Sequence, residues 1–365
     1  MPTREQFAKA KPDNKTFPME EFHKEMQRIR QHERDVSLKQ FLSETWGPEY
    51  TPEAFYSDLG IDLRQMTVEK MLNTSELSRW LFPEVFRDAI RTGLEYTPFF
   101  PRLITGEERI ESTGLTMPKI DLPPADETRL RDTKEGATIT EALVTWSDKQ
   151  VTIKKKARGL QQTYESIMFT PIDLARVYFE ELGSRLGADL DRDLIDIAFN
   201  GDQADGSEAA PVIGADTANT LTYLDIARAW VRFKRLNRNS VAMLVSEADA
   251  LKILNMEQFQ NRYPRDGAST SGVSLNVNTP LPNTQDLYVH SAIPDGKIVF
   301  VDPRRAFVQL TAMPLLIESE QLVRRQLRGE YVSIITGFAN VMRDGRLVLD
   351  YTATIIAEPG PTPQD

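Results

Sequence analysis

The chain has 365 residues, 40% of them hydrophobic, which is enough to bury a large core spread over two or three subdomains. Its formal net charge of −10 argues against sequence-blind binding along nucleic acid, which needs a cationic face, but not against enclosing a polyanion. The sequence has no cysteine, which excludes disulfides and thiolate chemistry, and no apolar run approaches the roughly 20 residues of a membrane span.

Residues 1–70 are highly charged, with both signs mixed. Apolar residues at helical spacing predict a narrow amphipathic helix that needs a partner surface: Phe22, Met26, Ile29 and Val36. A Gly-Pro turn within 45–52 breaks the helical pattern. A second helix is predicted over 75–95, with a local break at Pro83.

A projecting segment follows these helices. An extended stretch is predicted at 115–120, and a polar, proline-rich tip at 121–136. Residues 138–157 alternate apolar and polar side chains, the period of a half-exposed strand. The sequence therefore predicts a basic ribbon that leads directly into the next helix.

That helix, over 170–200, is the longest predicted element. Thr170 is its expected N-cap, Pro171 fits the first turn, and Asn200-Gly201 is typical of a left-handed helix end. About 29 residues at 1.5 Å each make a rod of roughly 44 Å. Apolar residues recur every four positions and predict one buried stripe: Leu174, Tyr178, Leu182, Leu186, Leu190, Leu194 and Ala198. A ribbon beside such a rod reaches beyond its own domain, which favours an assembly subunit over an enzyme.

The second half of the chain mixes short helices and strands. A helix is predicted over 222–236, then a buried strand at 241–245 and a helix capped by Ser246. Further strands are predicted at 287–289, 298–301 and 307–310, and within a closing block at 315–354 with a turn at Arg343-Asp344-Gly345. We expect the long helix to pack on that block through Leu182, Leu186 and Leu190 against Ile334, Phe338 and Val341. This mixture indicates an α+β fold.

Residues able to carry catalysis are sparse. His23 and His32 lie in the charged N-terminal segment without metal-ligand spacing, and His290 ends a strand. The segment 267–272 fails the GxSxG spacing, and the acids of 202–208 lack EF-hand spacing. We predict no catalytic residues, no metal site and no cofactor, so the chain is not expected to be an enzyme.

Two groups of cations are the candidate interface residues: Lys154, Lys155, Lys156 and Arg158 on the ribbon, and Arg324, Arg325 and Arg328 in the closing block. A nucleic-acid patch has little support because no aromatic side chains are interleaved for base stacking. Two interpretations stay open. The lysines protect an exposed strand edge, or the cations pair with acids of another subunit, such as Glu180, Glu181, Asp191 or Asp196.

The order of these parts resembles the tailed-bacteriophage major capsid proteins with the Hong Kong phage (Johnson) fold, over about residues 77–352. Leu81-Phe82-Pro83-Glu84-Val85 looks like the family's entry segment, and 109–157 looks like its extended E-loop. Phe199-Asn200-Gly201-Asp202 and Pro211-Val212-Ile213-Gly214 resemble the stretch after its spine helix. Gly337-Phe338-Ala339-Asn340 is similar to its closing strands.

The resemblance implies an α+β fold with an N-terminal arm, an extended E-loop hairpin, a long spine helix, a peripheral-domain sheet and an axial domain. The expected division is a charged N-terminal extension at 1–70, an N-terminal arm helix at 71–105, the E-loop and ribbon at 106–158, the peripheral domain with the spine helix at 159–219, the axial domain at 220–313, the closing peripheral strands at 314–356 and a disordered tail at 357–365. The extension falls outside the family pattern. It is either a retained arm, favoured by Trp46 and Tyr56, or a scaffolding segment that is cleaved. Lys134 and Asn340 have suitable types for an isopeptide cross-link, which no motif supports.

The implied function is that of a major capsid protein of a tailed double-stranded DNA phage. Hexamers and pentamers are expected to build an icosahedral shell, assembled in the host bacterial cytoplasm and retained in the virion. The implied partners are other copies of the chain, portal and scaffolding proteins, and enclosed DNA that is not read by sequence; no membrane is implied. One alternative is an encapsulin-type nanocompartment shell, against which the long N-terminal segment argues. A phage maturation hydrolase is disfavoured by the missing cysteine and Ser/His pair.

Overall fold

The computed structural model describes residues 22, 24–26, 28, 38–59, 67, 76–96, 98–111, 114–121, 145–169, 171–202, 209–235, 238–239, 242–256 and 286–354. These residues fold into two compact units, each assembled from separate stretches of chain. Unit 1 takes its described residues from 22–98, 154–190 and 312–336, and unit 2 from 99–153, 191–311 and 337–354.

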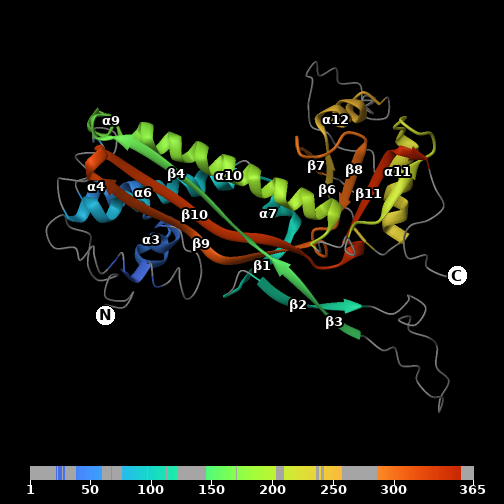
Figure 1. The fold of residues 1–365 in the computed structure, drawn as a ribbon, viewed down its shortest axis with the longest axis horizontal. Helices are drawn as coiled ribbons and strands as arrows, with labels where there is room; N and C mark the ends of the chain where they lie inside the picture. Colours follow the sequence, from blue (N-terminus) through green and yellow to red (C-terminus); the bar gives the residue numbers. More distant parts are fainter. Residues whose placement is uncertain are drawn as a thin grey trace, which may run out of the picture. The chain divides into compact units, whose positions relative to one another are not determined.

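Unit 1 combines helices with part of a sheet (Figure 1). Its helices are α3 (Leu38–Trp46), α4 (Pro52–Asp58), α6 (Glu76–Tyr96), α9 (Tyr164–Phe169) and the first part of α10 (Ile172–Asn200). Strand β4 (Lys154–Thr163) forms one edge of the sheet and pairs antiparallel with β10 (Leu327–Asn340). On the other side of β10 lies β9 (Phe307–Leu322), and the turn η1 (Val323–Arg325) joins these two strands.

The helices α6 and α10 meet backbone to backbone. A Cβ atom on Gly93 would collide with the Glu180 carbonyl, and one on Gly183 would collide with the Ile90 carbonyl. Beside these contacts the rings of Phe86 and Phe179 lie 4.3 Å apart between centroids. Small residues therefore set the spacing of this helix pair. The break expected at Pro83 is wrong, because α6 continues through it; packing of the later turns outweighs the one backbone donor that proline lacks.

The buried face of α10 differs from the predicted stripe. Its helix bounds are close to those predicted, and Gly201 ends it with φ 79° and an N–H bond to the Ile197 carbonyl. Yet Leu174 is 63% exposed and Tyr178 is 44% exposed, whereas Ala175 and Phe179 are buried. The expected packing on Val341 is also wrong, because that side chain is 45% exposed. Instead, Leu182 belongs to a core cluster that contains two strand residues, Leu315 and Val332.

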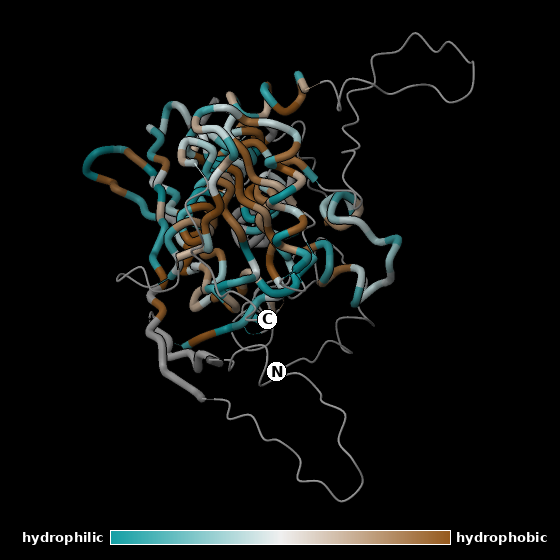
Figure 2. The backbone as a smooth tube through the Cα atoms, turned by 90° about the vertical axis from the view of Figure 1, so that its right-hand side faces the viewer, coloured by the Kyte–Doolittle hydropathy of each residue, from teal (hydrophilic) through white to brown (hydrophobic). Residues whose placement is uncertain are grey.

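Unit 2 contains a five-stranded sheet of order β5-β11-β8-β6-β7. The strands are β5 (Val212–Ala215), β6 (Ala242–Val245), β7 (Asp286–Val289), β8 (Lys297–Val301) and β11 (Arg346–Thr354). Helices α11 (Tyr223–Arg235) and α12 (Glu247–Leu254) pack on it through a core that includes Phe233, Ile253 and Phe300. Figure 2 shows the hydrophobic strands enclosed by hydrophilic segments. The predicted helices and strands of this region are confirmed, including the Ser246 cap, whose hydroxyl accepts a bond from the Asp249 N–H.

Unit 2 also holds α7 (Phe100–Leu103), β1 (Ile104–Arg109) and a two-stranded ribbon. Strand β1 runs parallel to the start of β9. The ribbon pairs β2 (Gly114–Asp121) with β3 (Thr145–Thr152), from Gly114 opposite Thr152 to Asp121 opposite Thr145. The extended stretch expected at 115–120 is confirmed. The basic segment 138–157, which was expected to form one strand, is not a single strand. It divides at Ile153 into β3 and β4, which belong to different sheets. Within the described chain, no helix is both long and apolar enough to cross a bilayer.

Candidate assembly surface

Antiparallel pairing divides the basic side chains of β4 between the two faces of its sheet. Residues that oppose each other in such a pair project to the same face. Arg158 opposes Val332, whose side chain belongs to the unit 1 core, and Lys154 and Lys156 share that face by alternation. Lys155 projects to the opposite face. These cations therefore do not all lie on one face of the sheet, and their role in subunit contacts remains a prediction.

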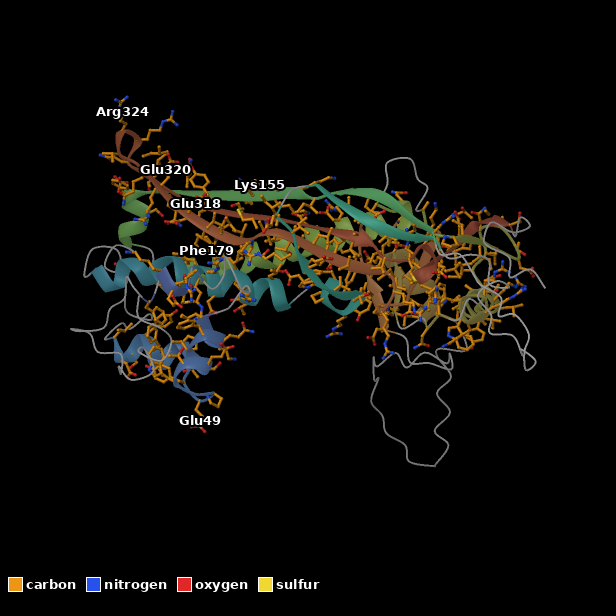
Figure 3. All side chains as sticks on the ribbon, turned by 90° about the horizontal axis from the view of Figure 1, so that it is seen from below. Glu49, Lys155, Phe179, Glu318, Glu320 and Arg324 are labelled. Atoms are coloured by element: carbon orange, nitrogen blue, oxygen red, sulfur yellow. The ribbon has the colours of Figure 1, made fainter. Side chains whose placement is uncertain are left out.

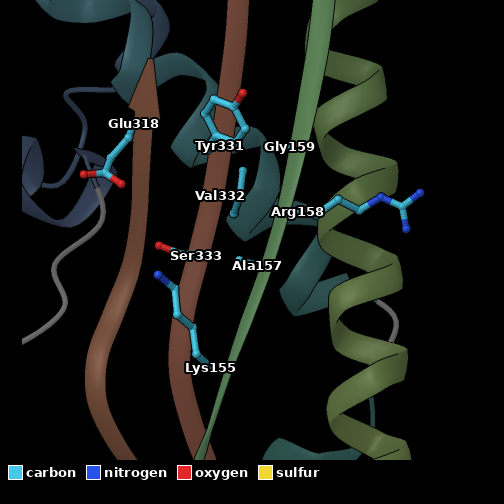
Figure 4. Close-up of a pocket in the computed structure, with 8 residues that line it drawn as sticks. All are labelled: Lys155, Ala157, Arg158, Gly159, Glu318, Tyr331, Val332 and Ser333. Carbon is cyan, nitrogen blue, oxygen red and sulfur yellow. The ribbon is translucent and has the colours of Figure 1, made fainter. Parts of the chain in front are cut away.

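Lys156 is held inside its own chain. Its Nζ atom donates a hydrogen bond of 2.9 Å to the Asp189 carbonyl on α10, which ties the edge strand to the helix. Arg158 is exposed, and its side chain extends toward α10 in Figure 4. Of the four cations, Lys155 is the one on the outer face of the sheet, where a partner approaching that face would meet it.

A shallow groove of about 310 Å³ lies on this outer face (Figure 4). Its lining comes from three adjacent strands: Lys155, Ala157, Arg158, Gly159, Glu318, Tyr331, Val332 and Ser333. The Tyr331 ring lies across Gly159 and Gly329, because a Cβ atom on either glycine would come within 2.6 or 2.7 Å of a ring carbon. Gln161 Nε2 donates a 3.1 Å bond to the Tyr331 hydroxyl. The groove is thus lined by the aromatic ring of Tyr331, the cation Lys155 from β4 and the anion Glu318 from β9.

The turn between β9 and β10 forms a basic tip. Val323 is 71% exposed, and Arg324 and Arg325 are exposed without an ion pair to any described residue. Gln326 closes the turn in the left-handed region at φ 50°. Figure 3 shows Arg324 at the far end of the strands. Arg328 behaves differently, since its Nε atom bonds the Glu330 carboxylate at 2.8 Å and both side chains are nearly buried.

The exposed large hydrophobic residues of unit 1 are found on three neighbouring elements. Among its described residues they are Tyr164, Leu174, Val177, Tyr178 and Val323. The elements are α9, the first turns of α10 and the tip, and the Tyr164 N–H bonds the Gln326 carbonyl at 3.0 Å. We call these five residues together with Arg324 and Arg325 the end surface. Leu174 and Tyr178 were expected in the core, so the sequence pattern concealed this surface.

Asp191 cannot serve as the partner acid for a neighbour's lysine. It is 3% exposed and accepts hydrogen bonds from the N–H groups of Phe99 and Phe100, at 3.3 and 2.9 Å. Burial raises the pKa of Asp191 to about 6, although the two N–H bonds act in the opposite direction. Its expected role at an interface is therefore wrong, because its carboxylate caps the start of α7 inside the chain.

Of the other candidate acids, two are exposed and have partners within the chain. Glu181 accepts a 2.9 Å bond from Arg185, and Asp196 accepts a 2.7 Å bond from Asn200. Glu180 is half-buried. Glu181 and Asp196 therefore have to share their carboxylates if they also pair with a second subunit.

The structure describes some of the histidines and acids that were considered from sequence as candidate sites. The described residues contain no group of three or more histidines and carboxylates able to hold a metal ion. The His290 Nδ1 atom accepts a 3.0 Å bond from the Ala292 N–H, as expected of an ordinary strand end. Asp202 accepts the Asn340 N–H at 2.9 Å and so has a structural role. Several candidates fall outside the described residues: His23, His32, Asp205, Glu208, Lys134 and the segment 267–272.

No family model matches the sequence, and a search of curated proteins finds no match. Solved structures do share its fold. A chain from the capsid of a native GTA particle aligns with a TM-score of 0.52 at 11% identity, over 72% of this chain and 91% of that one. A chain from Mycobacterium phage Che8 gives 0.51 at 12% identity, over 71% and 93%. A virus-like particle from Pyrococcus furiosus gives 0.50 at 11% identity, over 73% and 99%. These alignments confirm the α+β phage-capsid fold expected from the resemblance.

Proposed function

We propose that this chain is a shell subunit that assembles with copies of itself into a closed icosahedral capsid. The observation that carries the proposal is the fold shared with chains of capsid and virus-like particles, over nine tenths or more of those chains. The end surface adds support, because exposed apolar side chains rimmed by arginines are typical of a protein contact.

The finer proposal is the major capsid protein of a tailed double-stranded DNA phage, present as hexamers and pentamers. Residues 220–313 are then the axial domain at the capsomer centre, and 106–158 form the E-loop that clasps a neighbour. Portal and scaffolding proteins are the other proposed partners. The net charge of −10 suits a container whose wall must release its DNA cargo. In this proposal assembly takes place in the host bacterial cytoplasm and the shell persists in the virion.

A nanocompartment that encloses protein is the second candidate, favoured by the alignment with the Pyrococcus furiosus particle. The contents of purified particles distinguish a phage shell from a nanocompartment. In particles purified from the cells that naturally make the chain, a phage shell should hold no single cargo protein in fixed ratio. A nanocompartment should hold one, visible as a constant second band across the particle peak.

The end surface and the groove are the proposed contacts between copies. An exposed ion pair contributes only about 0–1 kcal/mol, but a closed shell repeats each pair at every equivalent interface. Reversing charge at the tip should therefore affect assembly much more than folding.

The test is expression of three versions: wild type, Arg324→Glu with Arg325→Glu, and Lys39→Glu as a control at an exposed cation on α3. Size-exclusion chromatography and electron microscopy count particles, and thermal melting of the subunit reports folding. We expect particles from the wild type and the control. The double variant should yield folded subunit with at least tenfold fewer particles. Wild-type protein that stays monomeric at high concentration contradicts the proposed function.

A further inference from the structure

The charged N-terminal segment contains a folded layer on unit 1. Its described residues are 22, 24–26 and 28, which have helical backbone, and 38–59, which contain α3 and α4. We call them the N-terminal layer. The capsid resemblance begins only near residue 77, so the family pattern gives this layer no role.

The layer has an aromatic core centred on Phe22. The Phe22 ring centroid lies 5.0 Å from Phe41, 5.5 Å from Phe55 and 6.3 Å from Trp46. Phe22 is 1% exposed, and Phe41 and Phe55 are fully buried. Truncating such a ring would leave a cavity that the surrounding side chains fill only in part. The layer is therefore a packed structure and not a tether along the surface.

Residues that end and begin helices determine the turn between α3 and α4. Gly47, at φ 110°, ends α3 and donates its N–H to the Ser43 carbonyl at 3.1 Å. Thr51 then caps α4, since its Oγ1 atom accepts the Ala54 N–H at 3.3 Å, and Pro52 occupies the first turn. The Tyr50 hydroxyl donates a 2.6 Å bond to Asp58 and closes the corner.

The layer shares one continuous core with the rest of unit 1. The cluster that contains Phe22 also contains Phe86 of α6 and Phe179 of α10. Tyr56, on α4, is 4% exposed and lies close enough to both helices for their charges to act on it. Burial raises the pKa of Tyr56 well above its ordinary value, Asp88 and Glu84 raise it further, and Arg176 lowers it.

The layer covers the side of α6 that α10 leaves open. At about 100° per residue, Glu84 lies roughly 160° around the helix from Phe86, the residue that faces α10. Glu84 is nevertheless only 3% exposed. Figure 3 shows α3 and α4 on the side of α6 away from the strands, with Glu49 at the outer margin. The layer thus holds α6 against α10 from outside.

We infer that the N-terminal layer is a permanent intramolecular clamp on α6 and α10, retained in the mature subunit, and not a scaffolding segment that is removed. Removing it would uncover apolar side chains of the shared core, which are stabilised by their burial. Processing of this chain, if it occurs, must then leave residues 22–59 in place.

A cleavable version of the full chain tests retention. A site-specific protease sequence is inserted after Gly60, beyond the end of the layer, and the cut protein is compared with uncut protein. After the cut, the N-terminal fragment should co-elute with the body in size-exclusion chromatography at low and high salt and separate only in denaturant. A fragment that leaves while the body keeps its melting temperature overturns the inference.

Substitutions test the clamp without an insertion. Phe55→Asp buries a charge in the aromatic core, and Ser57→Asp adds the same charge at an exposed position two residues away. Hydrogen exchange of the amides in 84–96 and 172–182 reports whether α6 and α10 loosen. We expect at least a tenfold increase in exchange for Phe55→Asp and no change for Ser57→Asp. Equal exchange in both variants overturns the clamp.

These measurements are independent of assembly. A chain that keeps its fragment but forms no particles contradicts the shell function and supports the clamp. A chain that forms particles but loses its N-terminal fragment supports the shell function and contradicts the clamp.

Discussion

Asp191 shows how one buried carboxylate links pH to the stability of unit 2. Its folded-state pKa of about 6 lies above the ordinary value of 3.8. The folded protein therefore holds a proton that the unfolded chain has released between these two values. The stability from this group is fully present below pH 3.8 and is lost as pH rises through 6. The cause is burial, which outweighs the bonds from Phe99 and Phe100.

Asp191→Asn should remove that pH dependence. The amide keeps one acceptor for the N–H groups but does not titrate, so the contribution of this position to the variant's stability does not change with pH. We expect the stability of the wild type relative to the variant to rise by about 1 kcal/mol between pH 7 and pH 5. Urea unfolding of both proteins at the two pH values measures this. The same difference at both values would show that Asp191 titrates normally when folded.

At the residue scale, the sequence identified the residues that cap helices, but it did not identify which polar side chains the fold buries. Capping residues such as Ser246 and Gly201 act on their own neighbours, so local spacing reveals them. The burial of Asp191 depends on a segment that lies 91 residues away in the sequence, and no local pattern reports it. The Gly159 and Gly329 positions under Tyr331 did leave a signal, since glycine inside a strand often marks a close approach.

At the scale of elements, helix bounds were predictable and the buried face of α10 was not. Leucines spaced by four residues drift about 40° per step, because a helix turns about 100° per residue. From Leu174 to Ala198 the predicted stripe therefore winds roughly 240° around the helix. Of its members, Leu182, Leu190, Leu194 and Ala198 are buried, and Leu186 is half-buried. The first turns instead bury Ala175 and Phe179 and present Leu174 and Tyr178 to the surface.

Two substitutions on α10 should separate folding from assembly. Leu182→Asp buries a charge in the unit 1 core and should unfold the unit, because truncating a core leucine alone costs about 2–5 kcal/mol. Leu174→Asp, at a position that is 63% exposed, should change the unfolding free energy by less than about 0.5 kcal/mol. It should still reduce particle yield, because Leu174 belongs to the end surface. Half-buried Leu186 should fall between them. Thermal melting and particle counts give both results, and normal particles from Leu174→Asp would exclude the end surface as a contact.

Because α6 and α10 are in close contact, we predict that a substitution favoured by helix propensity will destabilise the protein. Alanine is the better helix former by about 1 kcal/mol, yet Gly183→Ala should destabilise the protein by about 1–3 kcal/mol. The added Cβ atom would strike the Ile90 carbonyl, which cannot move without shifting α6. Gly106→Ala is the control, because nothing lies within 4 Å of a Cβ atom there. Denaturant unfolding should show the loss for Gly183→Ala alone; equal stability would mean that the helices separate without cost.

At the scale of the whole molecule, the sequence predicted the parts and their order but not their grouping. Each unit is built from separated stretches of the chain, and β1 pairs with a strand that begins 203 residues later, with Ile104 opposite Phe307. Periodicity is a local signal and contains no information on such pairings. The family resemblance supplied the fold that the alignments confirm, while the division into named domains stays a prediction.

The ribbon of β2 and β3 should matter for assembly and not for folding. It is a two-stranded sheet of its own, and a lone hairpin is marginally stable in water, so its proposed contacts are with a neighbouring subunit. Deleting 122–134, beyond the Asp121–Thr145 pair, leaves ten residues, 135–144, to connect the strands. The subunit should melt within about 2 °C of the wild type, since no described core residue is lost. It should form no closed shells by electron microscopy, whereas removal of the tail 358–365 should leave them intact. Normal particles from the loop deletion would show that the E-loop does not clasp a neighbour.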